Sequence, residues 1–157
     1  MFQTILLPLD GSETGAQAIP AASEMARRFG GRVHLVQVVD TGTASLALGA
    51  NAAAGGVTDP AAITGEVNER VEVAKAYLAA VAEQLAGDGI EATYEIHDGP
   101  EGDGIVEAAA TAGAELIVMS SHGRGGLGRL VFGSVADHVI RHAAAPVMVI
   151  RAVEHPG

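Results

Sequence analysis

A short apolar run, a glycine-rich stretch and the start of a helical pattern follow one another in the last third of the chain. The apolar run, Leu116–Met119, predicts a buried strand. Four of the six residues from Gly123 to Gly128 are glycine, and the helical pattern opens at Gly133-Ser134. Glycine lets the backbone approach an oxyanion, and a helix N-terminus presents unpaired N–H donors at the positive end of its dipole. The stretch therefore predicts a phosphate site; a mobile surface loop is the alternative.

Two common nucleotide motifs do not fit this stretch. A Walker-type loop needs Gly-Lys-Ser/Thr before its helix, and the only lysine of the chain, Lys75, lies elsewhere. Residues Gly123–Gly128 satisfy the dinucleotide pattern G-x-G-x-x-G letter by letter. However, the predicted helix opens about five residues too late for that pattern, and the next strand ends in Arg151 instead of an acidic ribose ligand.

Strand and helix patterns alternate along the whole chain. The helix after the first strand is capped by Ser12 or Asp10, and Pro20 is expected to kink it unless its regular part begins later. A long amphipathic helix has apolar positions from Val67 to Leu85. A further helix is expected from about Asp103 to Ala112. The predicted strands are Thr4–Leu9, Arg32–Val39, Glu91–His97, Leu116–Met119 and Pro146–Arg151.

The character of the strands suggests their order in the sheet. The first and fourth are continuously apolar, as expected of central strands, whereas the third alternates, as expected of an edge. Right-handed crossovers between parallel strands then give an α/β fold. We predict a five-stranded parallel sheet in the order 3-2-1-4-5 with helices on both faces. In that order, ligands bind at the carboxyl ends of strands one and four.

Length and composition predict a single domain over residues 1–157, with a mobile loop without regular structure at about 41–60. The formal net charge of −10 argues against a nucleic acid or an anionic membrane as partner. The longest apolar run is too short to span a bilayer, and the first residues lack the basic region of a signal peptide. With no cysteine in the chain, these features favour a cytoplasmic protein.

Three separated motifs make the chain resemble a known family. Ser121-His122-Gly123, nine residues and then Gly133-Ser134 fit the pattern G-x2-G-x9-G-[ST], except that Ser120 stands in place of the first glycine. The opening ILLPLDGSE and the tail APVMVI match as well. The chain resembles universal stress proteins of the ATP-binding type over essentially its whole length. The departure at Ser120 places a Cβ where the motif has none.

The resemblance implies an ATP site, with Mg²⁺, at the carboxyl ends of the first and fourth strands. A carboxylate such as Asp10 suits ribose hydroxyls as an acceptor, although it is also a candidate helix cap. The Ser134 hydroxyl and N–H suit a phosphate oxygen. The implied adenine and ribose contacts are Pro8, Leu9, Asp10, Val38 and Met119, and the implied phosphate contacts are Ser120, Gly123, Arg124, Gly133, Ser134 and Val135.

The same residues leave the function class open. No catalytic base or lysine is apparent near the phosphate stretch, so we expect a regulatory nucleotide-binding protein. A slow ATPase or nucleotidyl-transfer enzyme on the same scaffold and a non-binding structural module are the alternatives. His138 and His142 are four residues apart on a helix, but without a third ligand a solvated helix face is the simpler interpretation, and no metal site is expected.

The last strand predicts an assembly. Its residues Val147 to Ile150 are apolar on both faces, although the predicted order places the strand at an edge. An unprotected apolar edge promotes pairing with another chain. We therefore expect a homodimer through Pro146–Arg151, as the resembling family commonly forms; coverage of this strand by the chain's own helices is the alternative.

Overall fold

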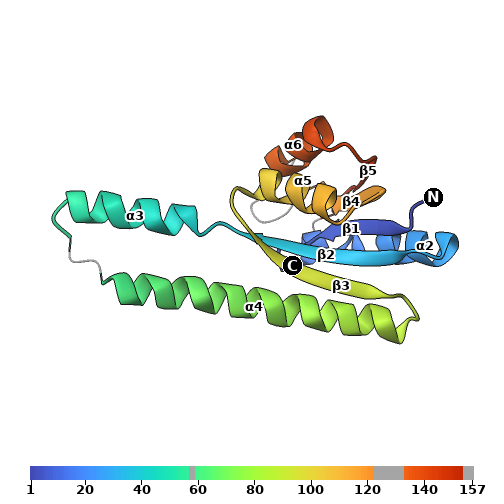
Figure 1. The fold of residues 1–157 in the computed structure, drawn as a ribbon, viewed down its shortest axis with the longest axis horizontal. Coiled ribbons are helices and arrows are strands. Elements are labelled where there is room, and N and C mark those ends of the chain that lie inside the picture. The colour runs from blue at the N-terminus through green and yellow to red at the C-terminus, as the bar shows by residue number, and fades with distance from the viewer. Residues whose placement is uncertain (57–58, 122–132, 154–157) are drawn as a thin grey trace.

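The computed structural model describes residues 1–56, 59–121 and 133–153. Its five strands form one parallel sheet in the order β3-β2-β1-β4-β5, which confirms the predicted topology (Figure 1). The strands are β1 (Thr4–Pro8), β2 (Arg32–Val39), β3 (Ala92–Asp98), β4 (Leu116–Ser120) and β5 (Val147–Ile150). Each agrees with its predicted range to within two residues at either end.

Helices cover both faces of the sheet. The helices are α1 (Glu13–Ala16), α2 (Ile19–Phe29), α3 (Gly42–Ala53), α4 (Pro60–Gly87), α5 (Glu101–Thr111) and α6 (Ser134–His142). One apolar core lies between the sheet and helices α2 and α4, and a second lies between the opposite face and helices α5 and α6. The central strands β1 and β4 are almost entirely buried, whereas the edge strand β3 is mostly half-buried or exposed. The reasoning from strand character is therefore confirmed.

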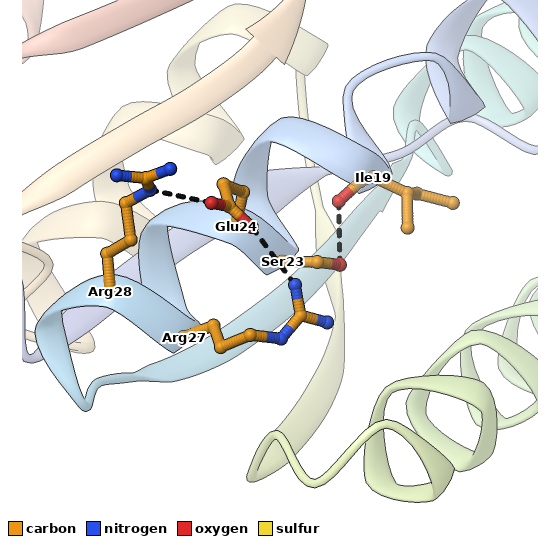
Figure 2. Close-up of polar contacts among 5 residues, drawn as sticks. All are labelled: Ile19, Ser23, Glu24, Arg27 and Arg28. Atoms are coloured by element: carbon orange, nitrogen blue, oxygen red, sulfur yellow. Dashed lines mark hydrogen bonds and ion pairs between the residues drawn. The ribbon is translucent and has the colours of Figure 1, made fainter.

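Pro20 does not kink a helix. It lies in the first turn of α2, where its missing N–H costs no hydrogen bond, and the preceding turn is a separate short helix, α1. Figure 2 shows the exposed side of α2, where Glu24 lies within 3.1 Å of Arg27 and 2.6 Å of Arg28. The hydrogen bond and charge of Arg28 lower the pKa of Glu24. Because these side chains are exposed, the pairs add little to stability.

The expectation of irregular structure at about 41–60 is wrong for most of that range, because Gly42–Ala53 form helix α3. Alanine and leucine dominate this segment, and both favour a helix even where no amphipathic period marks it. The side-chain hydroxyl and N–H of Thr41 donate to Asp98 Oδ1 at 2.7 and 3.1 Å, which ties the start of α3 to the end of β3. These hydrogen bonds lower the pKa of Asp98.

Helix α4 is much longer than the sheet that it covers. Its 28 residues extend about 42 Å, whereas the seven residues of β3 extend about 23 Å. Helix α3 and the first part of α4 lie side by side beyond the carboxyl ends of the strands (Figure 1). We call this pair of segments, Gly42–Ala53 and residues 60–70, the arm. The arm therefore projects from the side of the sheet formed by the carboxyl ends of the strands, where the sequence predicts a ligand site.

Candidate functional site

The carboxyl ends of β1 and β4 lie side by side and collect most of the predicted site residues. The two strands pair directly, with Ile5 opposite Leu116 and Leu6 opposite Ile117. Asp10 follows β1 by two residues, and Ser120 is the last residue of β4. The N–H of Gly133 donates to Ser121 O at 2.9 Å, which brings the start of α6 to the end of β4.

Ser12, rather than Asp10, caps the helix after β1. The Ser12 hydroxyl accepts a hydrogen bond from the Gly15 N–H at 3.0 Å. The same hydroxyl donates to Asp10 Oδ1 at 2.5 Å, and the Ser12 N–H donates to that oxygen at 2.9 Å. Asp10 is half-buried. The hydrogen bonds from Ser12 hold its carboxylate in one orientation. A carboxylate oxygen has more than one lone pair, so this arrangement fixes an acceptor at the end of β1.

Gly15 allows the Asp10 carboxylate to pack against helix α1. A Cβ at this position would lie 2.6 Å from Asp10 Oδ1, closer than real Cβ contacts. The glycine is buried and lies inside the helix, so close approach rather than unusual backbone geometry accounts for it. The three residues Asp10, Ser12 and Gly15 thus form one interlocked turn.

Apolar side chains form the inner part of this edge. Leu9 is 4% exposed and belongs to the core beneath α2 and α4, and its N–H donates to Val36 O at 2.9 Å. Met119 is 5% exposed and belongs to the opposite core, against which Val38 also packs. Pro8 and Val38 are half-buried. The predicted adenine and ribose residues therefore all lie at the carboxyl ends of the strands, but their side chains are divided between the two faces of the sheet.

The start of α6 presents backbone donors without a side-chain cap. Gly133 is its N-cap residue, and no side-chain hydrogen bond caps the helix in the described part of the chain. Ser134 is exposed at the first position, while Val135 packs against the core beneath α5 and α6. The first N–H groups of a helix have no partner within it and favour a negative charge. Gly123 and Arg124, also predicted to bind phosphate, lie outside the described residues.

A sequence profile of the Universal stress protein family matches residues 1–151 of the chain.

The chain belongs to the universal stress protein family. Universal stress protein MJ0531 of Methanocaldococcus jannaschii is 31% identical over 151 residues, which cover 96% of this chain and 83% of the relative. Among solved structures, protein MJ0577 of the same organism superposes with a TM-score of 0.82 at 25% identity and covers 99% of both chains. A universal stress protein from Archaeoglobus fulgidus in complex with dAMP has a TM-score of 0.66 at 24% identity, with 96% of this chain and 99% of the other covered. At that identity the likeness shows the fold alone.

Two residues of this edge gained no role from the sequence. Ser121 is 5% exposed, and its N–H donates to Ile150 O at 2.8 Å while its hydroxyl accepts from the Ala152 N–H at 3.1 Å. It thereby joins β4, β5 and α6. Tyr77 packs from α4 against the core that contains Leu9. Burial first, and then the negative charge of Asp10, raise the pKa of its hydroxyl. Its position, three residues after Ala74 and four before Val81 on an apolar helix face, is the signal that marks Tyr77 as inward-facing.

The histidines of α6 belong to a polar contact with α5. His138 Nε2 lies 2.7 Å from Asp103 Oδ1, and the His142 ring stacks on His138 with centroids 4.2 Å apart. Asp137 instead pairs with Arg141 at 2.9 Å. Across residues 1–56, 59–121 and 133–153 there is no group of three or more side chains that could hold a metal ion. In those same segments, no helix is both long and apolar enough to cross a membrane.

Proposed function

We propose that the protein binds ATP at the carboxyl ends of β1 and β4 and acts through the occupancy of this site. The observation that carries the proposal is the hydrogen bond from Gly133 to Ser121, because it places the start of α6 beside the strand that pairs with β1. One end of the site then offers Asp10 as an acceptor, and the other offers backbone N–H donors. An adenosine phosphate needs both kinds of group, because its ribose hydroxyls require an acceptor and its phosphates require donors.

The residues at this edge fit such a ligand. The oriented Asp10 carboxylate suits ribose hydroxyls, and the exposed Ser134 adds a hydroxyl to the backbone donors of α6. The dAMP complex of an Archaeoglobus fulgidus family member supports an adenine nucleotide. Mg²⁺ commonly binds through substrate phosphates with few protein ligands. ATP itself would therefore carry the ion into the site.

We further propose that any ATP turnover is slow. The chain's single lysine, Lys75, pairs with Glu72 at 3.0 Å on the exposed side of α4 instead of facing the start of α6. A protein that holds ATP without rapid hydrolysis can use occupancy as its signal. Multiple-turnover hydrolysis faster than about one per second would place the protein among ordinary enzymes and contradict this part of the proposal.

Isothermal titration calorimetry with Mg·ATP tests the site. Gly133 has φ −54° and ψ 155°, a conformation open to any residue, so Gly133→Val tests the approach of phosphate rather than backbone strain. We expect Gly133→Val and Asp10→Asn each to weaken ATP binding at least about tenfold, as for the loss of a charged hydrogen bond. Glu83→Gln on the exposed side of α4 is the matched control and should bind as the wild type does. Equal affinity in all four proteins would refute the site.

The assembly that we propose is a homodimer through β5. Pro146 O and Ile150 O accept hydrogen bonds from Ile117 and Ser121, on the β4 side. Because backbone groups alternate in a parallel strand, the N–H and C=O groups of Val147 and Val149 face the open edge. Pairing with the same strand of a second copy would satisfy these groups.

A further inference from the structure

Among the residues that the structure describes, the hydroxyl of Tyr77 is buried without a hydrogen bond. Its oxygen is shielded from solvent and has no partner within residues 1–56, 59–121 and 133–153. A buried hydroxyl left unpaired destabilises the folded state, so most such groups in folded proteins have a partner. Phenylalanine would fill the same space in the core without this cost. The hydroxyl therefore calls for an explanation outside the stability of the fold.

Tyr77 shares a core with the residue that precedes the proposed ribose contact. Tyr77 packs against the core that contains Leu9, the residue before Asp10. Burial first, and then the negative charge of Asp10, raise the pKa of the Tyr77 hydroxyl. Asp10 itself is held by Ser12. Tyr77 and Leu9, the residue before this turn, therefore contribute to one core on the α4 side of the sheet.

A second unpaired polar atom lies on the same face of the sheet. Gln37 Oε1 is buried and has no partner in the described part of the chain. Gln37 lies two residues after Leu35, which belongs to the core beneath α2 and α4, so its side chain is on the face that Tyr77 covers. Its neighbour Val36 binds the Leu9 N–H through its carbonyl, next to Asp10. A ligand hydroxyl can both accept and donate a hydrogen bond. The Tyr77 phenol could donate to such a hydroxyl, and Gln37 Oε1 could accept from one.

We propose that Tyr77 is a further ligand-binding residue of this site, whose hydroxyl forms a hydrogen bond with a sugar hydroxyl of the bound nucleotide. The inference rests on the proposed function, because it assigns a partner to the ligand held at Asp10. It also gives α4, and through it the arm, a direct contact with the ligand. The unpaired hydroxyl is then retained for binding at the expense of stability.

The test compares two effects of Tyr77→Phe that have opposite signs. Without nucleotide, the variant should melt at a higher temperature than the wild type, because an unpaired buried hydroxyl is gone. With calorimetry, the same variant should bind Mg·ATP about 3- to 10-fold more weakly, as expected for one lost hydrogen bond. Tyr94→Phe removes the other tyrosine hydroxyl, on the edge strand β3, and should change neither quantity.

Deoxy analogues identify the partner. If Tyr77 contacts a sugar hydroxyl, then either 2′-deoxyATP or 3′-deoxyATP should bind wild type and Tyr77→Phe equally well, while the other analogue remains sensitive to the substitution. Equal ATP affinity in wild type and Tyr77→Phe would overturn the inference, because the hydroxyl would then form no hydrogen bond with the ligand. Weakening of ATP and both analogues by the same factor would overturn it as well, because it would indicate a general structural effect.

The outcome is separable from that of the proposed function. If the wild type binds no adenine nucleotide, the proposed function fails before the Tyr77 comparison begins. If the wild type and Tyr77→Phe bind ATP equally while Asp10→Asn does not bind, only the Tyr77 inference fails. In the Tyr94→Phe background Tyr77 is the only tyrosine of the chain. The ¹³Cζ resonance of labelled tyrosine then reports its hydroxyl directly, and we expect it to shift on addition of ATP.

Discussion

The side-chain amide of Gln17 forms two hydrogen bonds with the backbone of Val153. Gln17 Nε2 donates to Val153 O at 2.8 Å, and the Val153 N–H donates to Gln17 Oε1 at 2.9 Å. The neighbouring Ala152 N–H donates to the Ser121 hydroxyl. The segment after β5 is therefore joined by hydrogen bonds to Ser121 at the end of β4 and to Gln17, the residue that follows α1.

Replacing Gln17 by methionine should release this segment. Methionine has a similar shape but neither donor nor acceptor of comparable strength, so both hydrogen bonds are lost. We expect the Val153 amide to lose its protection in hydrogen exchange and the free energy of unfolding to fall by about 1 kcal/mol, since exposed hydrogen bonds contribute little. Gln84→Met, on the exposed side of α4, is the control. Retained protection at Val153 in Gln17→Met would contradict the pairing.

Gly15→Ala should destabilise the protein although alanine is the better helix former. In an exposed helix the exchange stabilises by about 0.5–1 kcal/mol. At Gly15 the new Cβ would meet Asp10 Oδ1 at 2.6 Å, so the carboxylate and the Ser12 cap must move. Gly65→Ala in α4, where a Cβ meets nothing within 4 Å, should give the ordinary gain. Urea denaturation measures the change in the free energy of unfolding for both variants. A stabilising change in both would show that the Asp10 side chain can move away from the new Cβ at little cost.

A proline at position 149 should prevent dimer formation without disturbing the sheet. The Val149 N–H faces the open edge of β5, so its removal costs no hydrogen bond to β4. Tyr94→Pro is the matched control on the opposite edge, because the alternation from Glu91, whose carbonyl faces β2, turns the Tyr94 N–H outward as well. We expect sedimentation equilibrium to show a dimer for wild type and Tyr94→Pro and a monomer for Val149→Pro. A dimer in all three proteins would place the interface elsewhere.

The stability of the protein should decline in alkali partly because of Tyr77. Burial and the charge of Asp10 raise its pKa above the ordinary value of 10.0, so the folded protein keeps this proton where the unfolded chain has lost it. The stability that the buried, protonated Tyr77 contributes is fully present below pH 10 and is lost as the pH rises through the pKa of Tyr77 in the folded protein. With Tyr94→Phe in both proteins, Tyr77→Phe should lose stability less steeply above pH 10. Parallel curves from urea denaturation would contradict the burial of this hydroxyl.

The sheet could be predicted because its strands differ in ways that burial explains. Leu116–Met119 is apolar at every position because β4 is covered on both faces, and the alternation at Ala92, Tyr94 and Ile96 reflects an edge. The sequence of α3 carries no amphipathic pattern, because the arm extends beyond the sheet and no core requires an apolar stripe along this helix. Intrinsic propensity alone produces that helix.

The site was predictable only where residues follow strand ends in the chain. Asp10 and Ser120 lie at such ends, and the parallel topology brings them to one edge. The roles of Ser12 and Gly15 depend on atoms a few ångströms apart in a turn, which no spacing rule resolves. Tyr77 comes from a helix distant in sequence, so only the packing of α4 on the sheet shows that it shares a core with Leu9, the residue before Asp10.

The arm divides the chain into parts that should open independently. Residues 60–70 of α4 lie beyond the carboxyl ends of the strands, and each of them is exposed or half-buried (Figure 1). The part from Ala74 to Leu85 contributes four buried side chains to the core. Helical amides that lack such packing open by local fluctuations, at a free energy far below that of global unfolding. A single continuous helix would then exchange its amide hydrogens at two very different rates, with the boundary between them close to Tyr77. A ligand that binds Tyr77 would move that boundary toward the tip of the arm. Occupancy of the site would then change how many residues of α4 are stably helical.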